Sequence, residues 1–448
     1  MRKITGSVCL WGILLLITPG SGLSAEAIDN QALLEEIRAL RAKVAEMDAM
    51  KERLAELEAL VAARQPQPAA TAERPAAATT LDEDSRPMVK EVVEEVFAEK
   101  RPIAIGGALR FNYGYTDWNI DQDEKYGDAG FDIFRLNVDG ALADWILSAE
   151  YRFYSYQHTI HHGFVGYNVN DNWQVQAGIH QVPFGLLPYA SHNFWFSSAF
   201  YVGLEDDYDL GIKGLYQEGP WNLALAFYKN DELGSSTNLD RYSIDVVSGT
   251  DGNEETNQFN GRLAYLLDHG SLGETEVGVS GQWGQLYNNQ TRDMGDRWAG
   301  ALHLNGNYGN WNLQLEYAAY AYNPENPPGF DDDIIHVGGY ATSWPIPAEA
   351  DIGIVNVAYT FPLALKWLDS ITLYSDNTII APAADNQPTS WQNVIGALFA
   401  SGPVYTYLDV ISSENMIFSE PGSSMVDESV ANNDERNTRF NLNVGYYW

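Results

Sequence analysis

The chain has 448 residues, and its 26 basic against 61 acidic side chains give a net charge of −35. A nucleic-acid partner is not expected, because phosphate binding requires positive side chains. The single cysteine is Cys9, in the predicted signal peptide, so disulfides, thiolate catalysis and cysteine-bound metals are excluded from the mature chain. The length is ordinary for a large β-barrel.

The N-terminus has the pattern of an export signal. Arg2 and Lys3 precede an apolar run at 8–17, and Leu23-Ser24-Ala25 offers small residues for cleavage. We therefore expect residues 1–25 to be a signal peptide. No later run reaches the about 18 apolar residues that a membrane-spanning helix needs. The product is expected in the periplasm, outside the cell or in an outer membrane.

Residues 26–64 predict a short coiled coil, because apolar side chains recur at heptad spacing with one slip of three residues. These side chains are Leu33, Ile37, Leu40, Val44 and Met47. A single amphipathic helix packed on a domain is the alternative. Residues 65–101 are rich in Pro, Ala and Thr and predict a linker with a short amphipathic helix at 88–100. That helix is a candidate plug or collar for the segment that begins at Pro102.

From 102 to 448 the apolar period becomes two, which predicts an all-β transmembrane barrel. In 103–116, for example, the odd positions are apolar and end in aromatic residues, whereas the even positions are small, polar or charged. The same count predicts sixteen antiparallel strands near 103–117, 131–141, 144–156, 160–170, 172–182, 208–217, 220–230, 257–267, 273–286, 296–308, 310–322, 350–361, 369–380, 391–401, 403–414 and 438–448.

The stretch 334–343 is also strand-like, but we assign it to a loop, because a seventeenth strand would put the long connections on alternating sides. With sixteen strands, short turns fall at one end and long loops at the other, as in outer-membrane barrels. The long connections are 183–207, 231–256, 323–349 and 415–437. The N-terminal region is then expected in the periplasm of a Gram-negative bacterium, with the barrel in the outer membrane.

Two short motifs resemble a known family. His180-Gln181-Val182-Pro183-Phe184-Gly185 closes a strand before a long loop, and Val444-Gly445-Tyr446-Tyr447-Trp448 ends the chain. With the predicted coiled coil and barrel, the sequence resembles the phosphate-selective porin O/P superfamily, and within it DcaP-like trimeric porins. The resemblance implies a homotrimer in lipid and lipopolysaccharide that takes up small solutes, often anionic ones.

Basic side chains with inward parity predict a patch on the pore wall. Arg110, Arg135 and Arg152 are expected near mid-barrel on three adjacent strands, and Lys213 and Arg262 extend the patch. The loop 183–207 ends in three acidic residues, Glu205, Asp206 and Asp207, and is expected to fold inward as a constriction. A basic wall facing an acidic loop would create a transverse field. The alternative is that the arginines are ordinary lumen residues paired with Glu150 and Asp139.

Two clusters are weak metal candidates, and we expect no cofactor. Residues 117–128 have the oxygen spacing of a calcium loop, but Gln122 stands where an EF-hand requires glycine. Calcium or magnesium bound by loops is therefore only a minor expectation beside a solvated acidic loop. His161-His162 form no metal site if neighbouring strand residues face opposite sides.

The favoured function is an outer-membrane porin that forms a water-filled channel for small hydrophilic solutes. Phosphate-like, dicarboxylate-like and zwitterionic solutes are the candidates. No enzyme is expected, because His180 and His303 have inward parity but no nucleophile motif accompanies them. The alternative is an envelope tether or adhesin whose barrel is only an anchor. The solute, the sign of the selectivity, occlusion by loops and the oligomer number stay open.

Overall fold

The computed structural model describes residues 103–448 apart from 235, 250, 419–423 and 428–435. The predicted signal peptide at 1–25, coiled coil at 26–64 and linker with its helix at 65–101 lie outside the described residues. Within the described part, no helix is long and apolar enough to cross a membrane.

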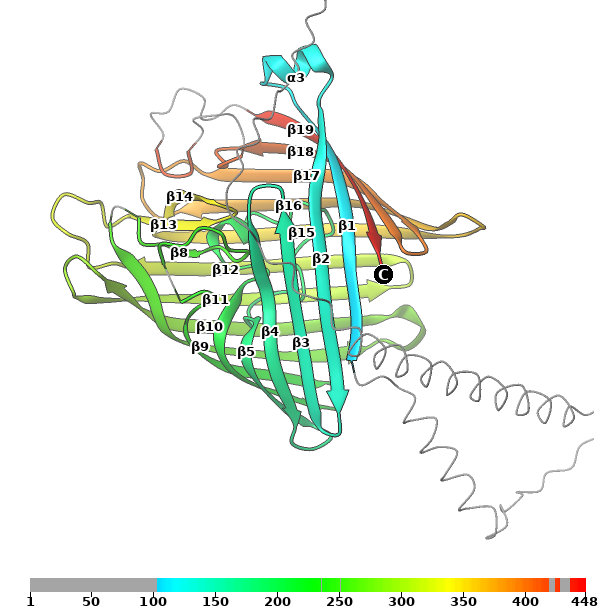
Figure 1. Cartoon of the computed structure of the whole chain (residues 1–448), viewed down its shortest axis with the longest axis horizontal. Helices are drawn as coiled ribbons and strands as arrows, with labels where there is room; N and C mark the ends of the chain where they lie inside the picture. The colour runs from blue at the N-terminus through cyan, green and yellow to red at the C-terminus, as the bar shows by residue number, and fades with distance from the viewer. Residues whose placement is uncertain (1–102, 235, 250, 419–423, 428–435) are drawn as a thin grey trace, which may run out of the picture. The chain divides into compact units, whose positions relative to one another are not determined.

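Sixteen antiparallel strands form one closed barrel, which is sealed where β1 pairs with β19 (Figure 1). The barrel strands are β1 (Ile103–Thr116), β2 (Asp128–Leu142), β3 (Trp145–Tyr154), β4 (His158–Asn168), β5 (Trp173–Gln181), β6 (Tyr208–Glu218), β7 (Trp221–Asp231), β9 (Asn253–Asp268), β10 (Glu274–Asn288), β11 (Met294–Tyr308), β12 (Trp311–Asn323), β15 (Glu349–Leu365), β16 (Leu368–Pro382), β17 (Ser390–Ser401), β18 (Val404–Glu414) and β19 (Asn437–Tyr447). Closure leaves no free edge in this sheet.

The sixteen predicted strands are confirmed, and only their ends differ. The strand β9 begins at Asn253, four residues before the predicted 257, and β2 begins at Asp128 rather than 131. The added residues of β9 are polar and those of β2 are Asp-Ala-Gly, so neither extension continues the apolar alternation. The strands extend there because the backbone finds a hydrogen-bonding partner. Glu254 and Glu255, for example, pair with Tyr287 and Leu286 of β10.

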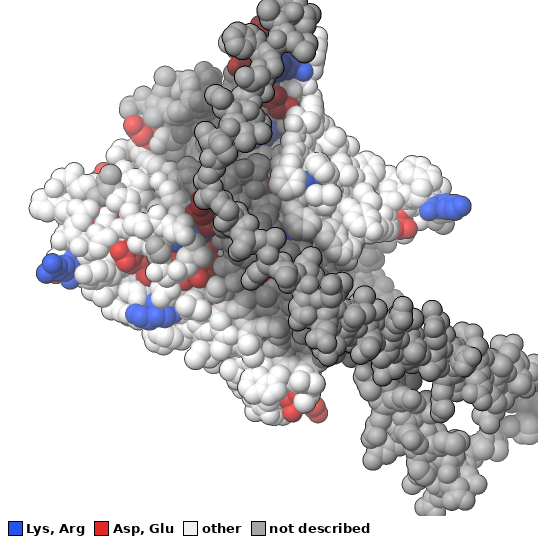
Figure 2. Space-filling model, in the orientation of Figure 1, with Lys and Arg blue, Asp and Glu red and all other residues white. Residues whose placement is uncertain are grey.

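Side chains alternate between the outer wall and the interior as predicted. In β1, Ile105 is 71% exposed, whereas Ala108 is fully buried. Large apolar side chains are exposed on strand after strand around the barrel. Figure 2 shows wide uncharged areas over the strands of one face, with charged side chains mainly toward the strand ends. An outer wall of this kind matches a surrounding of lipid.

The long loops gather at one end of the barrel and pack together there. They contain β8 (Asp245–Val246), β13 (Ile334–Gly339) and β14 (Thr342–Pro347), which form a separate sheet in the order β14-β13-β8. The stretch 334–343 therefore belongs to a loop and is not a strand of the barrel wall, as expected. Its Ile335 and Val337 share an apolar core with Phe200 and Val202 of the short 3-10 helix η2 (Phe200–Val202).

Short turns close the other end of the barrel. Gly309 and Gly402 take positive φ values of 62° and 53° in two of them, a conformation that glycine adopts without strain. Another holds the 3-10 helix η3 (Gly270–Leu272). Long loops at one end and short turns at the other are the predicted arrangement.

Candidate functional site

The connection 183–207 folds into the barrel and crosses its interior; we call it the crossing loop. Its start is fixed to the far wall through Gly185. Arg262 Nε of β9 donates to the Gly185 carbonyl at 2.8 Å, and the Gly185 amide donates to Ser280 Oγ of β10 at 2.8 Å. The next amide, of Leu186, donates to Glu316 Oε2 of β12 at 2.7 Å. Three strands on one side of the barrel, β9, β10 and β12, thus hold the first turn of the loop.

The middle of the crossing loop is held by Asp376 of β16. Its Oδ2 accepts hydrogen bonds from the amides of His192 at 2.7 Å and Asn193 at 2.9 Å, and its Oδ1 lies 2.7 Å from His192 Nδ1. Burial opposes the charged imidazole, but the hydrogen bond and charge of Asp376 prevail and raise the pKa of His192. Asn356 of β15 and Gln392 of β17 donate to loop carbonyls at 2.7 and 2.8 Å.

The acidic end of the crossing loop closes the loop on itself. Glu205 accepts hydrogen bonds from the amides of Ala190 at 2.9 Å and Ser197 at 2.8 Å and from the hydroxyl of Ser191 at 3.0 Å. Burial outweighs these bonds and raises the pKa of Glu205 to about 7. Asp206 accepts from Gln181 Nε2 at 3.0 Å and from the Tyr242 hydroxyl at 2.5 Å.

The crossing loop leaves a cavity of about 520 Å³ on the side of the barrel formed by β1, β2 and β3. Arg110, Arg135 and Arg152 all line it, as does Asp132. The loop side of this cavity is aromatic: Phe194, Trp195, Phe196, Phe200 and Tyr201 come from the crossing loop, and Tyr242, Tyr340 and Trp344 from the other long loops.

Each arginine of the cavity is paired with a carboxylate and lies over a ring. Arg110 Nε is 2.8 Å from Asp132 Oδ2, and its guanidinium carbon is 4.9 Å from the ring centre of Phe194. Glu150 accepts from Arg152 Nε at 2.5 Å and lies 3.5 Å from Arg135 Nε. The corresponding ring distances are 4.2 Å from Arg152 to Tyr242 and 5.3 Å from Arg135 to Tyr447.

This geometry combines both interpretations of the arginines. They converge on one cavity, as the predicted patch requires, and Glu150 is a partner, as the alternative requires. Asp139 instead accepts a hydrogen bond from Ser148, and Asp132 is the partner that the sequence did not indicate. Three guanidinium groups share two carboxylates in these ion pairs, so a positive excess faces the cavity.

The other two basic residues of the predicted patch do not line this cavity. Lys213 Nζ of β6 donates to the Gln181 carbonyl at 2.7 Å, and Arg262 contacts Gly185, Glu276 and His303. Both point inward, as parity predicted, but the start of the crossing loop lies over that part of the wall. Their contacts stabilise the base of the loop.

The predicted acidic face of the constriction also differs from the structure. Glu205, Asp206 and Asp207 line no part of the arginine cavity, and all three are buried. Their carboxylates accept hydrogen bonds within the loops or face other buried groups, because a tight loop must satisfy its own amides first. Aromatic side chains face the arginines in their place.

The local backbone at both predicted metal sites differs from what the sequence suggested. A register shift at Glu150/Tyr151 places His161 and His162 together, with their Nδ1 atoms 2.8 Å apart, so the assumption of opposite sides was wrong. They lie beside Glu150, but its carboxylate is already paired with Arg135 and Arg152. In the predicted calcium loop, 117–128, the residues form the short helix α3 (Ile120–Lys125). Asn119 Oδ1 accepts hydrogen bonds from the amides of Asp121 and Gln122 at the start of this helix.

Sequence reasoning missed the aromatic side of the cavity. Phe194, Tyr242 and Tyr340 belong to three different loops, and no periodicity connects them. The only signal is composition, since the crossing loop is rich in aromatic residues. The two inward histidines without a nucleophile also have structural contacts: His180 lies 3.2 Å from the Tyr228 hydroxyl, and His303 lies 2.9 Å from Arg262.

Comparison with known proteins bears on the fold alone. No family model matches the sequence, and no curated protein does. The anion-selective porin from Comamonas acidovorans matches with a TM-score of 0.50 and 12% identity, over 77% of this chain and 99% of that chain. The outer-membrane channel DcaP of Acinetobacter baumannii gives 0.49 at 12% identity, over 77% and 97%, and OmpT of Vibrio cholerae 0.49 at 11%, over 77% and 97%. The barrel thus shares the fold of a solved porin, which agrees with the fold that the sequence resemblance implied.

Proposed function

We propose that this protein is an outer-membrane porin that passes small hydrophilic solutes by passive diffusion, with anionic or zwitterionic solutes preferred. The observation that carries the proposal is the arginine cavity beside a loop that crosses a closed sixteen-stranded barrel. A barrel of this size has room for solutes, and the loop reduces that room to a passage lined by guanidinium groups.

The outer wall supports a location in lipid. Apolar side chains such as Ile105, Leu302 and Ile395 are 60 to 71% exposed on three different strands. A water-exposed wall of this composition would be an aggregation surface, whereas in a bilayer it is the favoured one. The Gram-negative outer membrane, with lipopolysaccharide around the loops and the N-terminal region in the periplasm, completes the proposal. A homotrimer belongs to it as well, because the sequence resemblance implies one.

The preference for anions follows from which charges face the cavity. Guanidinium groups stay charged at any physiological pH and bind carboxylate or phosphate oxygens in pairs. Asp132 and Glu150 neutralise only part of the three arginines. The rings on the opposite side offer apolar contact without adding a negative charge. A small solute with one or two carboxylates fits this pairing of a basic wall and an aromatic wall.

The test is the reversal potential of the purified, unboiled protein in a planar bilayer under a salt gradient. We expect conductance steps, grouped in threes, and a potential of the sign that indicates anion flow. Small dicarboxylates and phosphate should compete with chloride for the passage. A cation preference would contradict the assigned solute class, and a complete lack of conductance would contradict the porin itself.

A further inference from the structure

Six buried carboxylates meet where β6 and β9 begin and β7 ends, at the end of the barrel that bears the long loops. We call them the acidic cluster: Asp207, Asp209, Asp231, Glu232, Asp245 and Glu255, each 7% exposed or less. Asp209 lies in β6, and Asp207 directly precedes this strand. Asp245 lies on β8 of the small loop sheet. The cluster therefore joins the end of the crossing loop to the loop 232–252.

Three members of the cluster have the geometry of a ligand set. One carboxylate oxygen from each of Asp207, Asp209 and Asp245 lies within 4.8 Å of the oxygens of the other two. Glu232 lies beside them, and its negative charge is among the strongest influences on Asp245. Like charges at such separations in a buried place repel strongly.

The ion pairs of the cluster do not balance its charge. Arg241 Nη1 lies 3.0 Å from Asp245, 3.4 Å from Asp231 and 3.7 Å from Glu232, and Arg297 pairs with Glu255. Among the described residues, the ion pairs of the six carboxylates involve two cations, Arg241 and Arg297. An excess of four negative charges is left if every carboxyl group is ionised.

Unsatisfied oxygen atoms are an independent sign of a ligand. In the described part of the chain, Asp207 Oδ1, Asp209 Oδ1 and both oxygens of Glu232 are buried without a hydrogen-bond partner. Asp207 is 7% exposed, and Asp209 and Glu232 are 2% and 4% exposed. A buried carboxylate oxygen of this kind destabilises the fold when nothing binds it.

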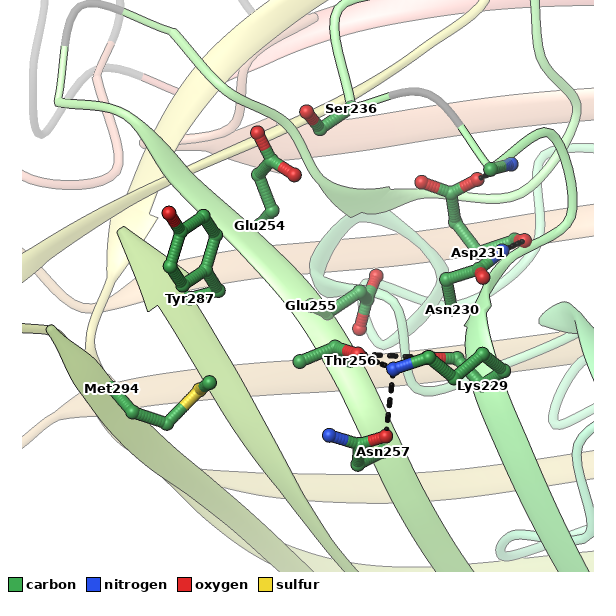
Figure 3. A pocket seen from close by; sticks show the side chains of 11 residues that line it. Lys229, Asn230, Asp231, Ser236, Glu254, Glu255, Thr256, Asn257, Tyr287 and Met294 are labelled. Atoms are coloured by element: carbon green, nitrogen blue, oxygen red, sulfur yellow. Dashed lines mark hydrogen bonds between the residues drawn. The ribbon is translucent and has the colours of Figure 1, made fainter. Parts of the chain in front are cut away.

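A crevice opens beside two members of the cluster. It has a volume of about 340 Å³ and lies between β7, β9 and the neighbouring strand ends (Figure 3). Asp231 and Glu255 line it and belong to the cluster as well, and Glu254 adds a further carboxylate at its wall. Lys229, the basic residue of the crevice, donates to Thr256 Oγ1 at 2.9 Å and to Asn257 Oδ1 at 2.8 Å, away from these carboxylates.

We propose that Asp207, Asp209 and Asp245 bind a divalent cation, with Ca²⁺ preferred, and that this ion pins the end of the crossing loop to the loop sheet. Ca²⁺ accepts six to eight oxygen ligands at about 2.3 to 2.6 Å in flexible geometry, so oxygens up to twice that distance apart can share it. Mg²⁺ requires a near-ideal octahedron of ligands at about 2.0 to 2.1 Å and loses its water reluctantly, so buried carboxylates fixed by the fold suit it less well than Ca²⁺. Glu232 supplies a further oxygen ligand.

The first test is calorimetric titration of CaCl₂ into the purified full chain, freed of lipopolysaccharide and of metal by EDTA. We expect one saturable site per chain. Asp207→Asn combined with Asp209→Asn should weaken it at least about a hundredfold, since two charged ligands are lost. The matched control is Asp240→Asn, because Asp240 is exposed in the same loop as Asp245. No saturable binding, or the same affinity in the double variant, would overturn the proposal.

A second test uses thermal unfolding and covers the case of a poorly folding variant. The wild-type protein should melt at a higher temperature in CaCl₂ than in EDTA, and MgCl₂ at the same concentration should raise the melting temperature less. Without metal, the double variant should melt no lower than wild type, because two repelling charges are gone. A wild-type melting temperature that is equal in CaCl₂ and EDTA would contradict the site.

Discussion

Two sectors of the barrel wall use their inward side chains in opposite ways. In the tethering sector, β9 to β17, polar side chains such as Ser280, Glu316 and Asp376 bind the backbone of the crossing loop. In the arginine sector, β1 to β3, the charged side chains bind one another and face a cavity. The first sector places the loop, and the second decides which solute finds favourable contacts beside it.

The contrast shows how a wall of uniform strand geometry gives a pore with two different sides. A loop amide needs an acceptor once it is inside the barrel, so the tethering sector is satisfied internally and presents little free charge. The three arginines pair with only two carboxylates, so one positive charge is left unbalanced and faces the cavity. Selectivity is therefore expected to follow the arginine sector, and loop position the tethering sector.

The largest effect is expected from Asp376→Ala in the tethering sector. The substitution leaves the amides of His192 and Asn193 without their acceptor, at a cost of about 3 to 5 kcal/mol. We expect a lower melting temperature and larger, noisier single-channel currents as the loop leaves the wall. Asp351→Ala is the control, because Asp351 is exposed and accepts one hydrogen bond from Tyr317. Unchanged currents would show that Asp376 does not hold the loop.

The loop itself should respond to pH through Glu205. Its folded pKa of about 7 lies above the ordinary 4.5, so its contribution to stability is complete below pH 4.5 and is lost as the pH rises through 7. The full difference is on the order of 3 kcal/mol. Melting curves of wild type should therefore shift down between pH 5 and pH 8, and less so in Glu205→Gln. The exposed Glu124→Gln should keep the wild-type shift; an equal shift in Glu205→Gln would contradict the assignment.

The arginine sector is tested by replacing Arg110, Arg135 and Arg152 with glutamine together. Asp132 and Glu150 then remain without their cations, and we expect the anion-to-cation permeability ratio to fall at least about tenfold, roughly 1.4 kcal/mol. Reversal potentials measure it. Lys366→Gln removes a basic residue that is exposed on the short turn between β15 and β16 and should leave the ratio unchanged. A triple variant with the wild-type ratio would contradict control by the arginines.

The smallest effect is expected from a comparison of alanine substitutions at two glycines. Gly185 has φ +55°, and a Cβ there would lie 2.4 Å from Glu316 Oε2, whereas Gly219 has φ +54° with nothing within 4 Å. Alanine at either position carries the same backbone strain, but only at Gly185 does it press on the tether. We expect Gly185→Ala to lower the free energy of unfolding by about 1 kcal/mol more than Gly219→Ala. Equal losses in denaturant titrations would place Gly185 outside the tethering contacts.

The sequence was sufficient to predict the barrel, because apolar and polar residues alternate along its strands. Ile105 and Arg110 have opposite parity, and the structure places them on the outer wall and in the cavity. Parity also placed Lys213 and Arg262 inward correctly, but it does not indicate which part of the wall a loop will cover. The bulge beside Glu150 shows the same limit on a smaller scale, since one extra residue brought His161 and His162 together.

The sequence by itself therefore determined the strand number, the two faces of each strand and the ends at which long and short connections lie. These features depend on local periodicity and on turn residues. Only the tertiary structure decided the path of the crossing loop, the aromatic partners of the arginines and the meeting of Asp207, Asp209 and Asp245. Those contacts join segments far apart in the chain, and they form because buried amides and charges must find partners across the lumen.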